Sequence, residues 1–73
     1  MVYVSRAPSM KGASAWAKEH IAEHEQEIKR VNQRFVPIEI EHKNGDKYLF
    51  MSIYYYEKCF KIGRHKGIDY VTI

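Results

Sequence analysis

Asn44-Gly45 is the feature of the sequence that most constrains the fold. This dipeptide favours a two-residue type I′ hairpin turn, because both central residues of that turn take positive φ. Alternating, β-rich segments flank it within residues 36–56. With Lys43 opposite Asp46, one face of the hairpin is aliphatic and predicts a core, since side chains alternate between the two faces of a strand. This register pairs His42 with Lys47, Ile40 with Leu49, Ile38 with Met51, and Val36 with Ile53.

The opposite face of the same hairpin is rich in aromatic rings. A hairpin packed on one side usually turns polar side chains to water on the other. Here the outer face pairs Glu41 with Tyr48, Glu39 with Phe50 and Pro37 with Ser52, and Tyr54 and Tyr56 follow. Four rings on that side predict a surface that contacts something else.

One long amphipathic helix is expected before the hairpin. Residues 14–33 contain neither proline nor glycine, and Ser14 is a suitable N-cap. Acidic residues come early and basic residues late, which matches the helix dipole. Apolar side chains recur at helical spacing, with a histidine in one position of the stripe: Ala17, Ile21, His24, Ile28 and Val31. Upstream, residues 2–4 predict an edge strand and residues 6–12 a loop.

A second tight turn at Glu57-Lys58 is expected after the hairpin. Without it, a continuing strand would direct charged positions into the core, whereas the turn pairs Tyr55 with Phe60 on the inner face. Residues 63–67 then form a basic loop between two glycines. Residues 68–73 predict a last strand, whose inward face the loop length does not decide.

These elements predict a single α+β domain over residues 1–73. One long helix packs in two layers on an antiparallel meander sheet of three or four strands. A single helix covers one face of a sheet, so the other face is expected to stay open. A chain this short buries only roughly 60% of its unfolded surface, and self-association is one usual way to supplement so small a core.

The cysteine content, the apolar runs and the net charge bear on the compartment and the partners of the protein. Cys59 is the only cysteine, so no disulfide forms within the chain, and we expect a reducing, cytoplasmic environment. We expect no membrane segment, because no apolar run approaches spanning length and residues 1–12 lack the apolar centre of a signal peptide. The net charge of +3 permits an anionic partner without requiring one.

His20-Ile21-Ala22-Glu23-His24 matches the H-x-x-E-H pattern of inverted zinc peptidases. Two histidines four residues apart on a helix can share one metal, and the glutamate between them could act as a base. Such enzymes need a third ligand from a further helix and a larger cleft, so we predict no metal site. The alternative is a structural metal at His20 and His24, with His42 or Cys59. Likewise, Cys59 and His65 could form a nucleophile–base pair, but no third group orients them, and we predict no catalytic site.

Five cationic or imidazole side chains lie within residues 58–66, next to the aromatic face. Rings edged by cations are the ingredients of single-stranded nucleic-acid binding, although Glu39 and Glu41 on the same face would repel phosphate. The same face could be buried in a homodimer or against another protein. We predict a cofactor-free, non-enzymatic regulator or inhibitor that acts through protein contacts, with a homodimer expected. Nucleic-acid binding is the alternative, and a small metal-independent ribonuclease toxin is a distant one. The predicted binding face comprises Tyr48, Phe50, Tyr54, Tyr56, Lys58, Lys61, Arg64, His65 and Lys66.

Overall fold

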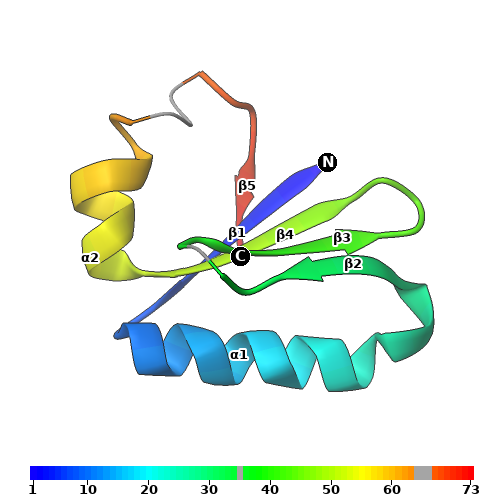
Figure 1. Ribbon diagram of the computed structural model, residues 1–73. Helices are drawn as coiled ribbons and strands as arrows, with labels where there is room; N and C mark the ends of the chain where they lie inside the picture. The colour runs from blue at the N-terminus through cyan, green and yellow to red at the C-terminus, as the bar shows by residue number, and fades with distance from the viewer. Residues whose placement is uncertain (35, 64–66) are drawn as a thin grey trace.

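The computed structural model describes residues 1–34, 36–63 and 67–73, and its strands form one sheet (Figure 1). Two helical segments interrupt the strands: α1, which is followed by the 3-10 turn η1, and α2, which continues directly into the π-helical turn η2. In chain order the elements are β1 (Val2–Ala7), α1 (Met10–Glu23), η1 (Glu25–Glu27), β2 (Ile28–Asn32), β3 (Ile38–His42), β4 (Lys47–Ser52), α2 (Ile53–Tyr55), η2 (Tyr56–Phe60) and β5 (Val71–Thr72).

The sheet has five strands in the order β2-β3-β4-β1-β5 and is mixed. Strands β2, β3 and β4 pair antiparallel, whereas β1 pairs parallel with both β4 and β5. The α+β class is therefore confirmed, and the antiparallel meander holds for three strands only. The expected edge strand at residues 2–4 lies instead inside the sheet, where Val4 and Ala7 are fully buried. Val4 packs on the α2 face and Ala7 on the α1 face, so β1 contributes to the core on both sides of the sheet.

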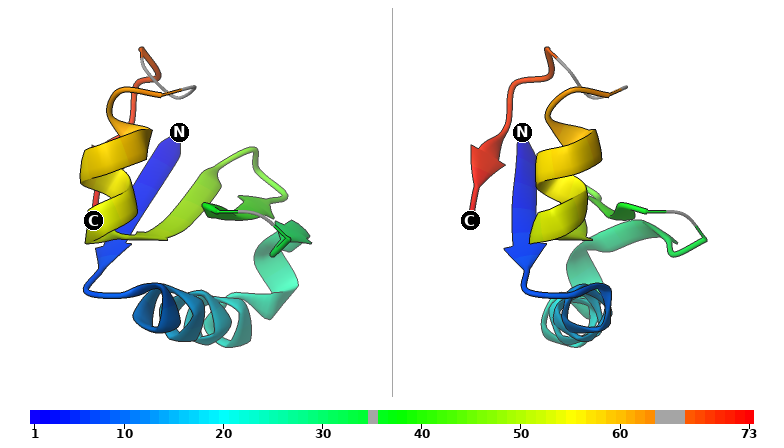
Figure 2. Two further views of the ribbon diagram at one scale, coloured as in Figure 1. Left: turned by 60° about the vertical axis from the view of Figure 1, so that its left-hand side comes forward. Right: turned by 90° about the vertical axis from the view of Figure 1, so that its left-hand side faces the viewer.

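Both faces of the sheet are covered, so the expected open face is wrong. In Figure 1, α1 runs below the strands, while α2 and η2 stand above the end of β4. Figure 2 shows the same two helical segments from the side. On the α1 face the buried core comprises Ala7, Ala13, Ala17, Ile38, Ile40 and Phe50. On the α2 face it comprises Val4, Leu49, Met51, Tyr56 and Phe60.

Helix α1 begins and ends earlier than residues 14–33. Ser9 is the N-cap, and its Oγ accepts a hydrogen bond from the backbone N–H of Gly12 at 3.1 Å. The helix ends at Glu23, and residues 28–32 form β2 on the edge of the sheet. The β-branched side chains Ile28 and Val31 fit both a helical stripe and a strand, and pairing with β3 decides between them.

The β3–β4 register differs by one residue from the expected one. Ile38 lies opposite Phe50 and Ile40 opposite Tyr48, because the loop between His42 and Asp46 holds three residues and not two. Backbone hydrogen bonds join His42 N–H to Asp46 O at 2.8 Å and Gly45 N–H to His42 O at 3.0 Å. Gly45 has a φ of 97°, and no described residue other than glycine has a positive φ. These features indicate a type I turn with a G1 bulge, whereas a type I′ turn would need positive φ at both central residues.

The shift turns every side chain of β4 over relative to β3, because strand side chains alternate with a period of two. Tyr48 and Phe50 consequently lie on the α1 face with Ile38 and Ile40, while Leu49 and Met51 lie on the α2 face.

Residues 53–60 are helical, so the expected tight turn at Glu57-Lys58 is wrong. Ser52 caps this segment, since its Oγ accepts a hydrogen bond from Tyr55 N–H at 3.0 Å. Helical spacing places Tyr56 and Phe60 on one side, where both are buried against the sheet. The segment thus meets the core without any charged residue pointing inward.

The expected last strand is shorter than residues 68–73, since β5 covers only Val71–Thr72 and pairs with β1. The centre of the expected basic loop, residues 64–66, lies outside the described residues. Across the described ranges, no helix combines the length and the apolar character needed to cross a bilayer.

Candidate functional site

The structure divides the nine predicted binding residues among three places. Phe50 is 5% exposed and Tyr56 is also buried, while Tyr48 is half-buried beneath α1, so these rings do not form an open face. Tyr54 and Lys58 lie exposed on the α2–η2 segment, and the exposed Lys61 directly follows it. The remaining three fall outside the described residues: Arg64, His65 and Lys66.

The exposed side of this segment is the first candidate site. We define the outer face of α2–η2 by the exposed residues Ile53, Tyr54 and Lys58 together with Lys61 and Ile62, which directly follow η2 and are also exposed. Tyr54 is 71% exposed and Ile62 is 72% exposed. Tyr54 and Lys58 lie within the helical segment, and Ile62 lies in the turn that directly follows η2. The outer face therefore presents apolar side chains with lysines between them.

The opposite side of α2–η2 is held firmly by the fold. The hydroxyls of Tyr56 and Tyr70 share a hydrogen bond at 2.8 Å, which together with burial raises the pKa of Tyr70. The Arg6 guanidinium lies 4.9 Å from the centre of the Tyr56 ring, within the range of a cation–π contact. On the exposed side, Lys61 forms an ion pair with Glu57 at 3.5 Å.

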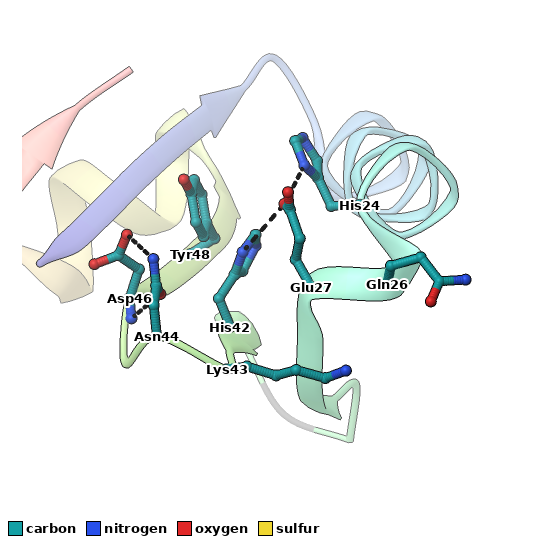
Figure 3. Close-up of a pocket in the computed structure, with 8 residues that line it drawn as sticks. All are labelled: His24, Gln26, Glu27, His42, Lys43, Asn44, Asp46 and Tyr48. Atoms are coloured by element: carbon teal, nitrogen blue, oxygen red, sulfur yellow. Dashed lines mark hydrogen bonds and ion pairs between the residues drawn. The ribbon is translucent and has the colours of Figure 1, made fainter.

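The second candidate is a histidine cluster formed by His20, His24 and His42. His20 lies on α1, His24 is the C-cap of that helix, and His42 lies on β3. The Nε2 atoms of His20 and His42 are 2.8 Å apart. Glu27 closes the cluster, because its Oε2 lies 2.9 Å from Nδ1 of His24 and 3.9 Å from Nδ1 of His42 (Figure 3). The turn η1 thus sets a carboxylate between two imidazoles.

Tyr48 packs the cluster against the sheet. Its ring stacks on Tyr3 with the ring centres 4.7 Å apart, and the ring centres of His20 and His42 lie 4.5 Å and 4.6 Å away. Burial raises the pKa of the Tyr48 hydroxyl, and Tyr3 contributes in the same direction. Beside these rings is a polar pocket of about 370 Å³, lined by His24, Gln26, Glu27, His42, Lys43, Asn44, Asp46 and Tyr48 (Figure 3).

The hydrogen bond between His20 and His42 depends on the protonation state of the two rings. Burial lowers the pKa of His20, and the neighbouring imidazoles of His24 and His42 lower it further. One Nε2 of the His20–His42 pair must donate and the other accept, so the bond requires at least one neutral ring. If both rings were protonated, both Nε2 atoms would be donors and the hydrogen bond between them would be lost.

The alternative of a metal at the H-x-x-E-H motif finds no geometric support. Among the residues that the structure describes, no group of three or more histidine, cysteine, aspartate or glutamate side chains is placed to hold a metal ion. The facing nitrogens of His20 and His42 point at each other and not at a shared third atom. Cys59 is exposed on η2, across the sheet from the cluster. The absence of stoichiometric zinc stays a prediction, which elemental analysis of the purified protein can test.

Sequence reasoning missed the partners that complete the cluster. The sequence places His42 on the core face of the hairpin opposite Lys47 and offers it as an alternative metal ligand, but it does not mark Glu27 or Tyr3 as site residues. Glu27, three residues after His24, was the available signal, because a turn after the helix brings such a pair together. Comparison with protein-family models, with curated proteins and with solved structures finds no match for this chain.

Proposed function

We propose that this protein is a small non-enzymatic binding module that recognises another protein through the outer face of α2–η2. The observation that carries the proposal is the exposure of Tyr54 and Ile62 on a segment whose other side is buried. Single exposed apolar residues are ordinary, but here a tyrosine and two isoleucines share one short segment. Tyrosine is a frequent anchor of protein interfaces, and a segment fixed by Tyr56 and Phe60 loses little freedom on binding.

The charges around the outer face favour a partner with an acidic rim. Lys58 and Lys61 flank the apolar side chains, and Glu57 offsets only part of the charge through its ion pair with Lys61. Charge at the edge of an interface acts mainly on the association rate and on the choice of partner. The matching surface has an apolar recess for Tyr54 and carboxylates at its edge.

A second copy of the chain suits this face less well than a different protein does. Two copies meeting through the outer face would bring Lys58 and Lys61 of each copy close to those of the other, and like charges repel. The expected homodimer therefore stays a prediction, which sedimentation tests separately.

Nucleic acid also fits this surface less well than protein does. Non-specific binding of single strands relies on several exposed rings on which successive bases stack. Three of the four rings expected for that role are covered or half-covered: Tyr48, Phe50 and Tyr56. Tyr54 alone does not make a stacking platform.

Photo-crosslinking from defined positions tests the proposal. A photoreactive residue replaces Tyr54, Ile62 or, as a matched control, Lys18, which is exposed on α1. We expect the same protein adduct from positions 54 and 62 and none from position 18. Once that partner is identified, Tyr54→Ala should weaken its binding by about 2 kcal/mol, roughly thirtyfold, while Lys18→Ala should leave it unchanged.

Two results would overturn the proposal. One is an identified partner that binds the parent and Tyr54→Ala equally well. The other is tight binding of single-stranded oligonucleotides that falls steeply with salt and disappears when Lys58→Glu and Lys61→Glu are combined.

A further inference from the structure

The two edges of the sheet differ in how well they are protected. The β2 edge exposes Lys29 and Arg30 and carries a register irregularity between Ile28 and Arg30, both of which discourage pairing with a further strand. The side chains of Val71, Thr72 and Ile73 on the β5 edge carry no charge, and all three residues are exposed. In the right-hand view of Figure 2, β5 stands on the outer side of β1 with no other element beyond it.

The backbone of β5 has groups free to pair on its outer side. The N–H of Ile73 donates to the carbonyl of Val4 at 2.9 Å, so this residue directs its backbone groups toward β1. Successive residues of a strand alternate in this direction. The N–H and C=O of Thr72 therefore point outward, where within the described part of the chain they meet no strand.

A groove with an apolar floor runs beside this edge on the α1 face. Val71 lies opposite Tyr3 in the sheet, so Val71 and, by alternation, Ile73 direct their side chains to that face. The groove has a volume of about 280 Å³ and is lined by Trp16, Glu19, His20, Glu23, Phe50 and Ile73. Trp16 is 42% exposed at its border.

The charge of the groove is acidic, in contrast with the basic chain as a whole. Glu19 and Glu23 line it, and neither has an ion-pair partner among the described residues. An incoming segment gains most if it brings lysine or arginine to these carboxylates and apolar side chains to Trp16 and Ile73.

We propose that the β5 edge accepts an extended segment of a partner protein, which pairs with Thr72 and carries apolar and basic side chains over the groove. Main-chain hydrogen bonds would supply affinity and the groove would supply selectivity, as in other cases of strand addition. This site lies apart from the outer face of α2–η2, so either proposal can fail without the other.

Trp16 is the only tryptophan and reports binding through its fluorescence. The probe is an eight-residue peptide, TVTKTVTK, which places valine and lysine on one face of a strand. The matched control, TVTETVTE, keeps the valines and reverses the charge. We expect a saturable blue shift with the lysine peptide and at least tenfold weaker binding of the glutamate peptide. Combining Glu19→Lys with Glu23→Lys should invert this preference.

The backbone contribution is tested at Thr72. Thr72→Pro removes the outward N–H without touching the bonds to β1, so it should abolish peptide binding, whereas Thr72→Ala should retain it. If Thr72→Pro unfolds the protein, a peptide with methylated backbone nitrogens provides the same test. Methylation removes the N–H donors that would pair with the carbonyl of Thr72, so this peptide should not bind. Tyr54→Ala should bind the peptide as the parent does.

The proposal is overturned if the lysine peptide gives no saturable change at millimolar concentration or if both peptides bind equally. Peptide binding that survives both Thr72→Pro and backbone methylation would also overturn it. A dimer seen in sedimentation would also overturn the proposal if Thr72→Pro dissociates it and added peptide does not. In that case a second copy of the chain, and not a partner segment, would occupy the β5 edge.

Discussion

Nε2 of His20 lies 2.8 Å from Nε2 of His42, and this hydrogen bond ties helix α1 to the hairpin strand β3. Around the pair lie Glu23 at the end of α1, His24 at its C-cap, Glu27 in η1 and Tyr48 in β4. The bond needs one ring to accept, so the junction between helix and sheet is sensitive to protonation.

The stability of the fold should therefore fall as the pH is lowered below 6.5. The folded state lowers the pKa of His20 from 6.5, so the unfolded chain binds more protons in this range. The neutral ring contributes stability above pH 6.5, and this contribution is lost as the pH falls from there through the folded-state pKa. Denaturant titrations between about pH 7.5 and about pH 5.5 measure the slope. His20→Gln should flatten it, and an unchanged slope in that variant would contradict the assignment to His20.

Phe50→Leu should destabilise the protein by about 1 to 2 kcal/mol, because the ring is buried beneath α1 and a smaller side chain leaves part of its space unfilled. Tyr54→Leu is the matched control and should stay within about 0.5 kcal/mol of the parent, since Tyr54 is exposed. Unfolding midpoints in urea report both. A larger loss of stability in Tyr54→Leu than in Phe50→Leu would contradict the observed register and would support the expected one, in which Phe50 lies on an open face.

Gly45→Ala should cost about 1 kcal/mol or more, because the residue has a φ of 97° that side chains with a Cβ rarely adopt. Asn44→Ala should cost less, since Asn44 has no positive φ and loses only the contacts of its side chain with Asp46. Thermal unfolding of the two variants compares them directly. An equal loss of stability in Gly45→Ala and Asn44→Ala would indicate the two-residue type I′ turn.

Ser9→Ala should lower stability by about 1 kcal/mol, because it removes the hydrogen bond that caps α1 at Gly12. Ser14→Ala lies within the helix and should be neutral or slightly stabilising, as alanine has the higher helix propensity. Circular dichroism during denaturation follows both variants. A larger loss at Ser14 would mean that the helix begins there.

The existence of the hairpin was predictable from Asn44-Gly45, and its register was not. One additional loop residue separates the two alternatives, and both contain a glycine with positive φ at position 45. The hydrophobic pattern did not choose between them, because residues 49–51 are apolar on both faces of β4. A strand covered on both sides carries no polar face to show its orientation.

A local pattern that fits both helix and strand also explains why the bounds of the two helical segments differ from the predicted ones. Ile28 and Val31 continue the stripe of α1, yet they pair with β3, since long-range pairing overrides local periodicity. At residues 53–60 the run of tyrosines suggested a strand, while the cap at Ser52 starts a helix. The register affects the histidine cluster through β4, because the observed pairing places Tyr48 on the α1 face, where its ring contacts those of His20 and His42.

The position of β1 also bears on how the chain folds. Val2 pairs with Lys47 and Tyr3 with Val71, so β1 lies between two strands that are distant from it in the sequence. During synthesis the hairpin of β3 and β4 can form early, but β1 must wait for β4, and β5 closes the arrangement last. Contacts so distant in sequence slow folding. Until the ribosome has released residues 71–72, this protein has no complete sheet.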